Sequence, residues 1–397
     1  MLDNPRAEFD ALKARWQEGH ALPREFYTSQ AIYDLDIDQY WNRSWIWAGH
    51  ESQIAEPGDY LLCDYGPESV IVVRDREGAV RAHLNICRHR GSRICTEAAG
   101  KARVFSCPYH AWTYELSGAL RKGQAMGPDF DPAQYGLLPV QVTLFEGLIF
   151  ICLSDTPPPV AADLARLQPL VAPFELSNLK LAHRASYPVP ANWKLAVENY
   201  MECYHCGPAH LEYSRSHSLK DPAQMAQLRP AMQDRMAQCG LPVADFDNYD
   251  HAAPGAELFW RRYPLFDGYQ TGSRSGEPVA PLLGRLTGFD GGTSDLCLGV
   301  INNFLVYSDH MVAYRFLPRG LQETDIEMQW YVRGDAVEGR DYNIDSLTWL
   351  WHVTTLDDER IIRHNQEGVN SRRFIPGPLS QMEDSITGFS RNYFALF

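Results

Sequence analysis

Two stretches of the sequence combine side chains at spacings that suit metal chemistry. Cys87 and His89 are separated by one residue, and Cys107 and His110 by two. Paired thiolates and imidazoles bind zinc or an iron–sulfur cluster, and four unrelated buried residues are the ordinary alternative. Further along, His205 follows Glu202 by three residues and precedes His210 by five. The first set predicts a metal site.

The unequal spacing of the first set separates the alternatives. Structural zinc sites usually place two or more residues between the members of each pair. One residue in the first pair and two in the second are typical of a Rieske [2Fe-2S] centre, where two thiolates hold one iron and two imidazoles the other. We therefore predict a [2Fe-2S] cluster between the tips of two β-hairpins, and Gly91 and Pro108 suit such tips.

Short strands must position this cluster. From about Trp45 to Leu153, short apolar runs alternate with turn residues, which predicts a compact antiparallel β domain that ends at prolines 157–159. Residues 137–153 are too polar to span a bilayer and predict a hairpin of two buried strands. We expect an N-terminal helical segment at 1–42 that packs on the catalytic domain, a cluster domain at 43–156 and a catalytic domain at 157–397.

The second half of the chain mixes helices with strands. Residues 193–206 predict a helix capped by Asn192, and residues 346–365 predict a second long helix with one apolar face. Three strands of a meander are expected at residues 296–307, 311–317 and 324–332; a further helix is expected at 3–19. The predicted fold class is α+β, with an all-β N-terminal domain and a C-terminal domain of antiparallel sheet and helices in a helix-grip-like arrangement.

Two runs of sequence resemble the large (α) subunits of Rieske non-haem iron oxygenases. The first contains Arg88, Arg90, Gly91, Cys95 and residues 105–114, and it differs from most members in having Ala111 where they have glycine. The second is 192–210, which resembles the mononuclear iron motif of the family. The resemblance covers nearly the whole chain and implies a mononuclear Fe(II) in addition to the cluster.

The second run explains how two distant histidines could share one iron. On an ideal helix His205 and His210 would diverge by roughly 140°. Gly207 and Pro208 allow the helix to break between them. Two imidazoles and one carboxylate on one face of iron leave positions open for O2. The resemblance implies that the carboxylate comes from the late helix, with Asp358 favoured and Asp357 as the competing choice.

The same motif contains residues that act beside the iron. The resemblance implies that Glu202 bridges the iron histidine of one subunit and a cluster histidine of its neighbour, so that the active unit is a homotrimer. Asn199 is expected to act with Glu202 at this site. Cys203 and Cys206 form a pair that could be a redox dithiol or a zinc site, and we expect reduced structural thiols.

The local run around Glu202 and the segment from Asn365 to Ser371 look more like the oxygenases of quaternary amines: glycine betaine, proline betaine, carnitine and choline. This implies hydroxylation of an N-methyl carbon, which then leaves as formaldehyde. A quaternary ammonium binds aromatic faces by cation–π attraction. Candidate pocket residues are Trp260, Tyr263, Phe304, Tyr307 and Trp349, with Phe259 and Trp351 in the same segments.

Two alternatives stay open. One is an aromatic-ring hydroxylating mono- or dioxygenase α subunit that acts on a small aromatic acid. The other is an electron-transfer protein whose second domain only binds a partner. Metal content distinguishes the latter, because it predicts two irons per chain instead of three.

Composition and charge restrict the partners. A net charge of −14 argues against nucleic acid. No glycine-rich dinucleotide fingerprint is visible, so a separate NADH-dependent flavin/iron–sulfur reductase must supply electrons; O2 and a small-molecule substrate complete the reaction. Residues 1–5 have no secretory pattern and no apolar run could span a membrane, so we expect a cytoplasmic protein with reduced thiols.

Overall fold

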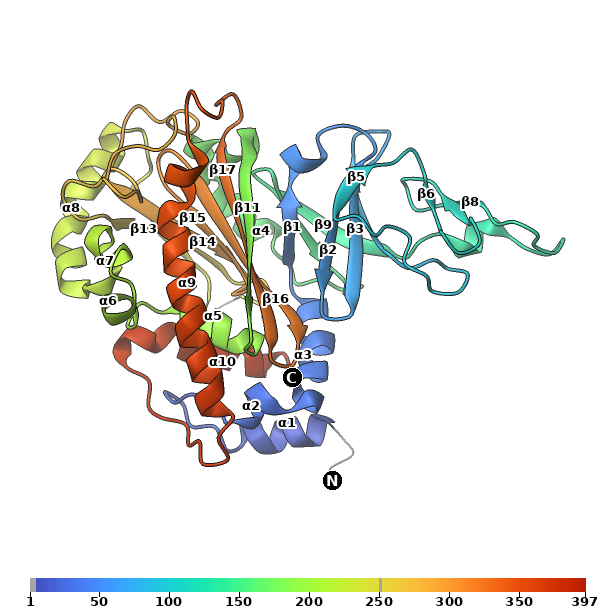
Figure 1. Ribbon diagram of the computed structural model, residues 1–397, viewed down its shortest axis with the longest axis horizontal. Helices are drawn as coiled ribbons and strands as arrows, with labels where there is room; N and C mark the ends of the chain where they lie inside the picture. Colours follow the sequence, from blue (N-terminus) through green and yellow to red (C-terminus); the bar gives the residue numbers. More distant parts are fainter. Residues whose placement is uncertain (1–4, 250–251) are drawn as a thin grey trace. The chain divides into compact units, whose positions relative to one another are not determined.

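The computed structural model describes residues 5–249 and 252–397 (Figure 1). The chain divides into two compact units: Trp45–Pro157 is one, and Met1–Ser44 together with Pro158–Phe397 is the other. The sequence places the corresponding divisions at 43 and 157. The first four residues, on which the expectation of no secretory signal partly rests, lie outside the described residues.

The unit Trp45–Pro157 is built from antiparallel strands, as its alternating apolar runs predict. Seven strands form one sheet in the order β1-β10-β9-β4-β3-β2-β5, and three short strands form a second sheet in the order β6-β7-β8. The strands are β1 (Ile46–His50), β2 (Asp59–Tyr65), β3 (Glu68–Arg74), β4 (Val80–Leu84), β5 (Ala99–Lys101), β6 (Phe105–Ser106), β7 (Thr113–Tyr114), β8 (Leu120–Lys122), β9 (Pro139–Phe145) and β10 (Leu148–Cys152).

The predicted hairpin at residues 137–153 is the pair β9 and β10. Its two-residue connection, Glu146 and Gly147, has φ values of 48° and 83°. Positive φ at both positions matches the twist of the two strands, which is why such a tight turn closes here.

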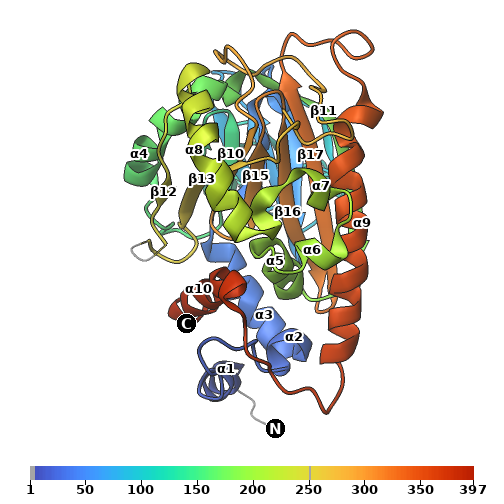
Figure 2. The same cartoon turned by 90° about the vertical axis from the view of Figure 1, so that its left-hand side faces the viewer.

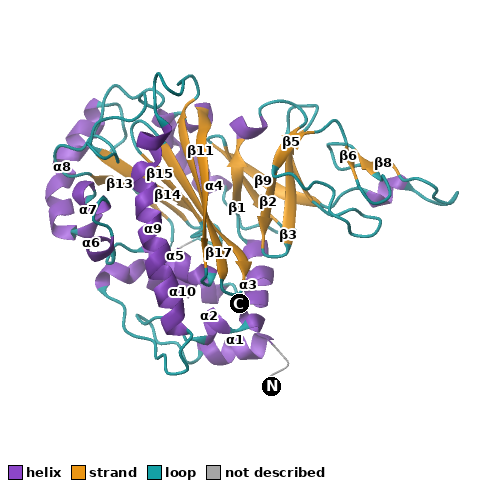
Figure 3. Cartoon of the chain, in the orientation of Figure 1, coloured by secondary structure: helices purple, strands orange, loops and turns teal. Residues whose placement is uncertain are grey.

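The larger unit contains a second seven-stranded antiparallel sheet, in the order β11-β17-β16-β15-β14-β13-β12 (Figure 3). The expected strand at residues 296–307 is in fact two strands, because Gly299, with φ of 60°, turns the chain between them. The strands are β11 (Leu179–Val189), β12 (Phe246–Asp247), β13 (Leu258–Pro264), β14 (Gly292–Leu298), β15 (Asn302–Val306), β16 (Met311–Gly320) and β17 (Glu323–Arg333).

Two helices cover this sheet: α5, which precedes His205 and His210 in the chain, and α9, which contains Asp358 (Figure 2). The long helix α9 packs against β11, and α5 packs against α9, β16 and β17. The side chain of Asn192 accepts from the Lys194 amide (3.1 Å) and so confirms the predicted cap of α5. The helices are α1 (Pro5–Lys13), α2 (Glu25–Thr28), α3 (Gln30–Gln39), α4 (Ala161–Val171), α5 (Trp193–Met201), α6 (Cys206–Ala209), α7 (Tyr213–Ser216), α8 (Pro222–Gln238), α9 (Ile344–Val369) and α10 (Asp384–Ala395).

The N-terminal helices pack against the last helix of the chain. The ring of Phe9 in α1 lies 5.5 Å from that of Phe26 and 5.7 Å from that of Tyr393 in α10. Asp36 in α3 forms a buried ion pair with Lys194 in α5. These contacts tie both ends of the chain to the helix that precedes the iron motif. Within the described ranges, no helix has the length and apolar character needed to cross a bilayer.

Candidate functional site

The two cysteine–histidine pairs lie in loops with the same backbone pattern. In each loop the cysteine carbonyl accepts a hydrogen bond from the amide four residues later, from Gly91 to Cys87 (2.9 Å) and from Ala111 to Cys107 (3.0 Å). Both residues at that fourth position have positive φ, 78° for Gly91 and 56° for Ala111. The loops are therefore structurally equivalent around their cysteines.

This equivalence gives a physical meaning to the departure at Ala111. A side chain in the left-handed region meets steric resistance of roughly 1–2 kcal/mol, which glycine avoids. Most members of the family have glycine where this chain has Ala111, and the positive φ shows why glycine is usual there. The conformation is retained because the hydrogen bond to Cys107 and the flanking strands hold it.

Within these loops the thiols are buried and the imidazoles are exposed. Burial raises the pKa of Cys107, but the backbone amides of Tyr109 and His110 and the neighbouring Cys87 thiol lower it more, so the net pKa is below its ordinary value. The rings of His89 and His110 lie 4.7 Å apart. Two buried thiols and two exposed imidazoles are the donor set that a Rieske cluster requires.

The second set of predicted ligands lies where α5 ends. The helix stops at Met201 because Glu202 is extended, with φ of −126° and ψ of 162°, so it is shorter than the expected 193–206. The short helix α6 then begins at Cys206, directly after His205, and His210 follows its end. The break lies before His205, at residues 202–205, and Gly207 and Pro208 lie within α6. The prediction that the helix breaks at Gly207-Pro208 is therefore wrong in position, although the two histidines do face each other.

Three donor atoms meet at one point. The Nε2 atoms of His205 and His210 are 3.0 Å apart, and Asp358 Oδ1 lies 3.4 Å from the first and 3.1 Å from the second. Neighbouring ligands on one face of an octahedral metal are separated by the bond length times the square root of two, which is about 3.0 Å for bonds of roughly 2.1 Å. The spacing fits a divalent metal held by a facial triad.

Hydrogen bonding and charge agree with that fit. Asp358 Oδ1 is buried and, among the described residues, has no hydrogen-bond partner. Burial raises the pKa of Asp358, but the two imidazoles lower it more, so this carboxyl is held below its ordinary pKa. A buried oxygen without a donor and two converging imidazole nitrogens form a set that a cation would complete.

The structure also separates the two aspartates that the sequence left in competition. Asp358 approaches the Nε2 atoms, whereas Asp357 Oδ2 lies 3.6 Å from Nδ1 of His210, on the outer side of the ring. Asp357 also lies 3.5 Å from Arg360. One residue of helix rotation, about 100°, moves a side chain off the shared face, so only Asp358 reaches the meeting point.

Glu202 holds His205 from behind. Its Oε1 lies 2.5 Å from Nδ1 of His205, while its Oε2 accepts from the backbone amides of His205 (3.1 Å) and Tyr204. Burial lowers the pKa of His205, but the neighbouring carboxylates of Asp358 and Glu202 outweigh it and raise the pKa to about 9. A carboxylate hydrogen-bonded to Nδ1 fixes the orientation of the ring, so that Nε2 faces the point where the three donor atoms meet.

Cys203 and Cys206 form a disulfide in the structure, with Cα atoms 4.9 Å apart. The sequence interpretation expected reduced structural thiols, and the structure differs. The reason is local: the turn between Met201 and α6 brings the two side chains together across His205. The other seven cysteines are free, including both predicted cluster ligands.

A cavity of about 400 Å³ opens onto the triad. Its wall includes His205, His210 and Asp358 and aromatic side chains from four different elements. On α9 the lining positions are Trp351, Thr354 and Asp358, which share one face of the helix at spacings of three and four. The aromatic residues of the wall are Tyr200, Tyr213, Tyr263 and Trp351.

The structure brings one of the five proposed substrate residues to this cavity, and strand alternation explains why. In β13 the even-numbered residues from Leu258 to Pro264 are buried, and the odd-numbered ones are partly exposed. Tyr263 therefore faces the cavity, while Trp260 packs on the opposite face, 5.7 Å from the ring of Phe174. Because side chains alternate between the two faces of a strand, the spacing of Trp260 and Tyr263 in the sequence already places them on opposite faces.

The other three candidates lie elsewhere. Phe304 is fully buried, next to Leu305, which does line the cavity. Tyr307 lies behind the wall, where its hydroxyl accepts from Trp351 Nε1 (3.1 Å). Trp349 lines a different cavity, under the guanidinium of Arg274 (4.6 Å). The interpretation missed Tyr213, Asp295 and Arg261, which do line the iron cavity.

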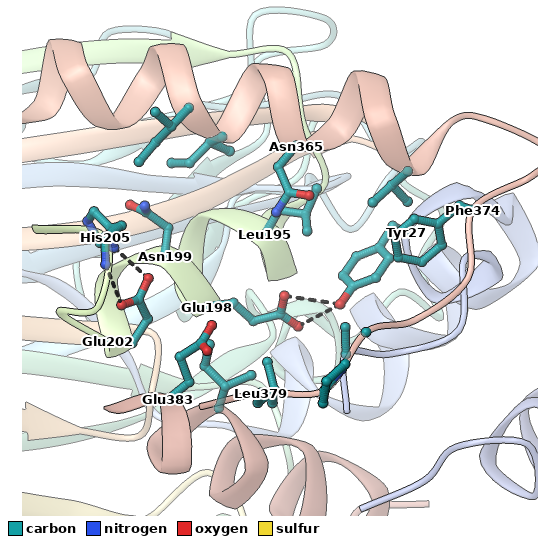
Figure 4. Close-up of a pocket in the computed structure, with 17 residues that line it drawn as sticks. Tyr27, Leu195, Glu198, Asn199, Glu202, His205, Asn365, Phe374, Leu379 and Glu383 are labelled. Atoms are coloured by element: carbon teal, nitrogen blue, oxygen red, sulfur yellow. Dashed lines mark hydrogen bonds and ion pairs between the residues drawn. The ribbon is translucent and has the colours of Figure 1, made fainter. Parts of the chain in front are cut away.

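A second cavity of about 340 Å³ lies on the other side of Glu202 (Figure 4). Asn199, Glu202 and His205 line both cavities. In this second cavity the Tyr27 hydroxyl lies 3.0 Å from both carboxylate oxygens of Glu198. Burial raises the pKa of Glu198 to about 8. The residues beside His205 thus form a thin partition between the iron cavity and a second cavity.

Comparisons with known proteins agree with both sites. Residues 44–144 match the Rieske [2Fe-2S] domain, and residues 176–264 and 302–396 match the ring hydroxylating alpha subunit (catalytic domain). The glycine betaine monooxygenase oxygenase subunit of Pseudomonas aeruginosa (strain UCBPP-PA14) is 36% identical over 388 residues, which cover 95% of this chain and 88% of that protein. The protein of the same name from Chromohalobacter salexigens is 37% identical over 394 residues, 96% of this chain and 87% of that protein.

Solved structures share the fold. The quaternary ammonium Rieske monooxygenase CntA has a TM-score of 0.72 at 23% identity and is matched over 95% of each chain. Naphthalene 1,2-dioxygenase from Rhodococcus sp. has a TM-score of 0.67 at 18% identity, covering 100% of this chain and 98% of that one. These matches confirm the predicted fold class.

The cluster loops, the triad and the similarity over nearly the full length lead to one assignment. The [2Fe-2S] cluster belongs to the first unit and the mononuclear iron to the second. The chain belongs to the Rieske non-haem iron oxygenases, as an α-type oxygenase subunit with monooxygenase relatives.

Proposed function

We propose that this enzyme hydroxylates an N-methyl group of a quaternary amine or betaine and so removes it as formaldehyde. The overall reaction consumes O2, NADH and one proton. It converts R–N⁺(CH3)3 into R–N⁺H(CH3)2 with formation of formaldehyde, water and NAD⁺. The hydroxymethyl intermediate breaks its C–N bond, and the nitrogen lone pair that remains takes a proton.

The aromatic lining of the iron cavity carries this proposal. A trimethylammonium group donates no hydrogen bonds, so aromatic faces are its natural partners, each contributing about 0.5–2 kcal/mol. Tyr213, Tyr263 and Trp351 line the cavity together with the triad. The names of the relatives that match 95% of this chain point to the same class of substrate.

Two of these rings are held by a buried network. The His217 ring stacks on Tyr213, with centroids 4.2 Å apart. Nε2 of His217 lies 2.7 Å from the Tyr307 hydroxyl. The same hydroxyl accepts a hydrogen bond from Trp351 Nε1. Burial lowers the pKa of His217 to about 3, so the ring is neutral and accepts the Tyr307 proton. The network fixes Tyr213 and Trp351 in place and leaves their faces toward the substrate.

His205, His210 and Asp358 would hold the iron, and Cys87, His89, Cys107 and His110 the cluster. Bound in the triad, Fe(II) supplies the activation of O2. Glu202 accepts the Nδ1 proton of His205, which keeps Nε2 available as a ligand. The aromatic rings exclude water from the reacting methyl group.

We further propose a homotrimer in which Glu202 links the triad to the cluster of a neighbouring copy, with electrons supplied by an NADH-dependent flavin/iron–sulfur reductase. Tyr204, Leu211 and Leu356 are exposed apolar side chains near this site, and Ile86 and Tyr109 are exposed beside the cluster loops. Such surfaces favour contact between copies. Glu202 lies in the thin partition between the two cavities and would give electrons a short path from the neighbouring cluster to the iron.

The test is a substrate comparison with purified oxygenase and a flavin/iron–sulfur reductase. Glycine betaine and L-carnitine are expected to drive NADH oxidation with one formaldehyde released per NADH. Benzoate serves as the aromatic comparison. Hydroxylated benzoate, together with no formaldehyde from either betaine, would overturn the proposal in favour of an aromatic-ring hydroxylase.

A further inference from the structure

The iron cavity contains two opposite charges that do not neutralise each other. Arg261 of β13 and Asp295 of β14 are direct partners in the antiparallel register, and both line the cavity. Opposite charges at such positions usually form a cross-strand ion pair. Among the described residues no ion pair joins these two. Instead, Arg261 Nε lies 3.2 Å from Asp245 Oδ2.

Asp295 has few hydrogen-bond donors for a partly buried carboxylate. Within the part of the chain that the structure describes, it accepts one hydrogen bond, from the Tyr200 hydroxyl (3.1 Å). Burial raises the pKa of Asp295 to about 6. A carboxylate removed from water requires a cation or several donors. The carboxylate therefore has capacity for a positive charge that the cavity itself does not supply.

The surroundings of Asp295 indicate the kind of cation. Burial raises the pKa of Tyr213 and of Tyr263, and the charge of Asp295 raises both further. The carboxylate therefore lies within electrostatic range of the two tyrosine rings that face the iron. Aromatic faces beside one carboxylate, with few hydrogen-bond donors, suit a quaternary ammonium better than a primary amine.

Arg261 is available to a second ligand group. Its side chain is 37% exposed, and its ion pair with Asp245 is a surface pair, which contributes little to stability. Its guanidinium also lies over the Phe259 ring at 5.2 Å, which orients it. Replacing the ion pair of Arg261 with Asp245 by one with a substrate carboxylate would therefore cost little free energy.

We propose that Asp295 and Arg261 together select a short zwitterion: Asp295 faces the quaternary ammonium and Arg261 binds the carboxylate. This inference rests on the proposed function and names the substrate class within it. Directly opposed residues on adjacent strands have Cα atoms about 4.5–5.5 Å apart. The pair therefore favours a substrate whose two charges are separated by one to a few carbons.

The experiment separates the two charges of the ligand. Glycine betaine is the substrate, and two competitive inhibitors each lack one charge: tert-butylacetate lacks the cation, and choline lacks the carboxylate. The variants are Asp295→Asn and Arg261→Gln. Asp247→Asn is the matched control, because that carboxylate is exposed on the neighbouring strand β12 and does not line the cavity. The cluster spectrum and iron content verify the fold of each variant.

Asp295→Asn should raise KM for glycine betaine at least tenfold, with a smaller change in kcat, and leave Ki for tert-butylacetate nearly unchanged. Arg261→Gln should raise KM for glycine betaine and leave Ki for choline nearly unchanged. An equal loss of affinity for glycine betaine and for the inhibitor that lacks the matching charge would show a structural role and overturn the proposal, as would an unchanged KM in both variants.

The experiment distinguishes a failure of the proposed function from a failure of the charge pair alone. A wild-type enzyme that oxidises no betaine refutes the proposed function and this inference with it. A wild-type enzyme that demethylates glycine betaine, but whose selectivity is insensitive to both variants, refutes the charge pair alone.

Discussion

The two metal-binding regions are built in different ways. The cluster ligands come from two loops close in sequence, and each loop is shaped by its own backbone hydrogen bonds around Cys87 and Cys107. The iron ligands come from a broken helix and from α9, near the end of the chain, and packing of α5 on α9 brings them together. One region is organised locally, and the other depends on tertiary structure.

This difference has a consequence for substitution. In the cluster loops, the neighbours of the cysteines adjust the electronic properties of the site. In the iron site, Asp358 is the triad residue on α9, so its substitution removes the contribution of that helix to the metal. Loss of an iron ligand should therefore abolish the iron site, whereas substitutions beside the cluster cysteines should alter the cluster by degrees.

The largest effect is expected for Asp358→Ala. Loss of the third ligand should abolish turnover, by at least a hundredfold, and reduce the iron from three to two per chain, while the visible spectrum of the cluster remains. Asp357→Ala is the matched control, since that carboxylate lies 3.6 Å from His210 Nδ1 and outside the triad. Iron analysis and absorption spectra check this. Loss of the third iron in the Asp357 variant alone would reverse the assignment.

A smaller effect is expected for Glu202→Gln. The variant keeps an oxygen for the backbone amides but loses the charge on Nδ1 of His205, where a charge-assisted bond is roughly twice as strong as a neutral one. Both metals should remain, and electron transfer from cluster to iron should slow by about tenfold. Single-turnover kinetics measure this, with Glu212→Gln as a nearby surface control. An unchanged rate would remove Glu202 from the electron path.

The smallest effect is expected for Tyr114→Phe in the cluster domain. The Tyr114 hydroxyl lies 3.2 Å from Cys87 Sγ, and hydrogen bonds to sulfur raise the reduction potential of such clusters. A bond of about 1–1.5 kcal/mol corresponds to roughly 40–65 mV for one electron. The potential should therefore fall by that amount with the cluster intact. Redox titration checks this against Tyr135→Phe, and equal potentials in the two variants would contradict it.

The comparison also shows which kinds of residue could be predicted. Cys87, His89, Cys107 and His110 were predicted from spacing, because their loops are short and the backbone between the ligands leaves little freedom. His205 and His210 were predicted from the resemblance of their motif, and the helix break that turns them toward each other lies before His205 and not at Gly207-Pro208. Tyr263 was found among five aromatic candidates, but its neighbour Trp260 was chosen with it although the two face opposite sides of one strand.

The sequence alone determined the [2Fe-2S] site, the histidine pair, the cap at Asn192 and the α+β class, since each depends on spacing or periodicity within one segment. Only the tertiary structure placed Asp358 at the triad and Asp357 outside it, paired Cys203 with Cys206, and set Arg261 beside Asp295 in the cavity. Those relations depend on helix rotation, on a turn and on strand register. A one-residue change in any of them moves a side chain to another face, and only packing decides it.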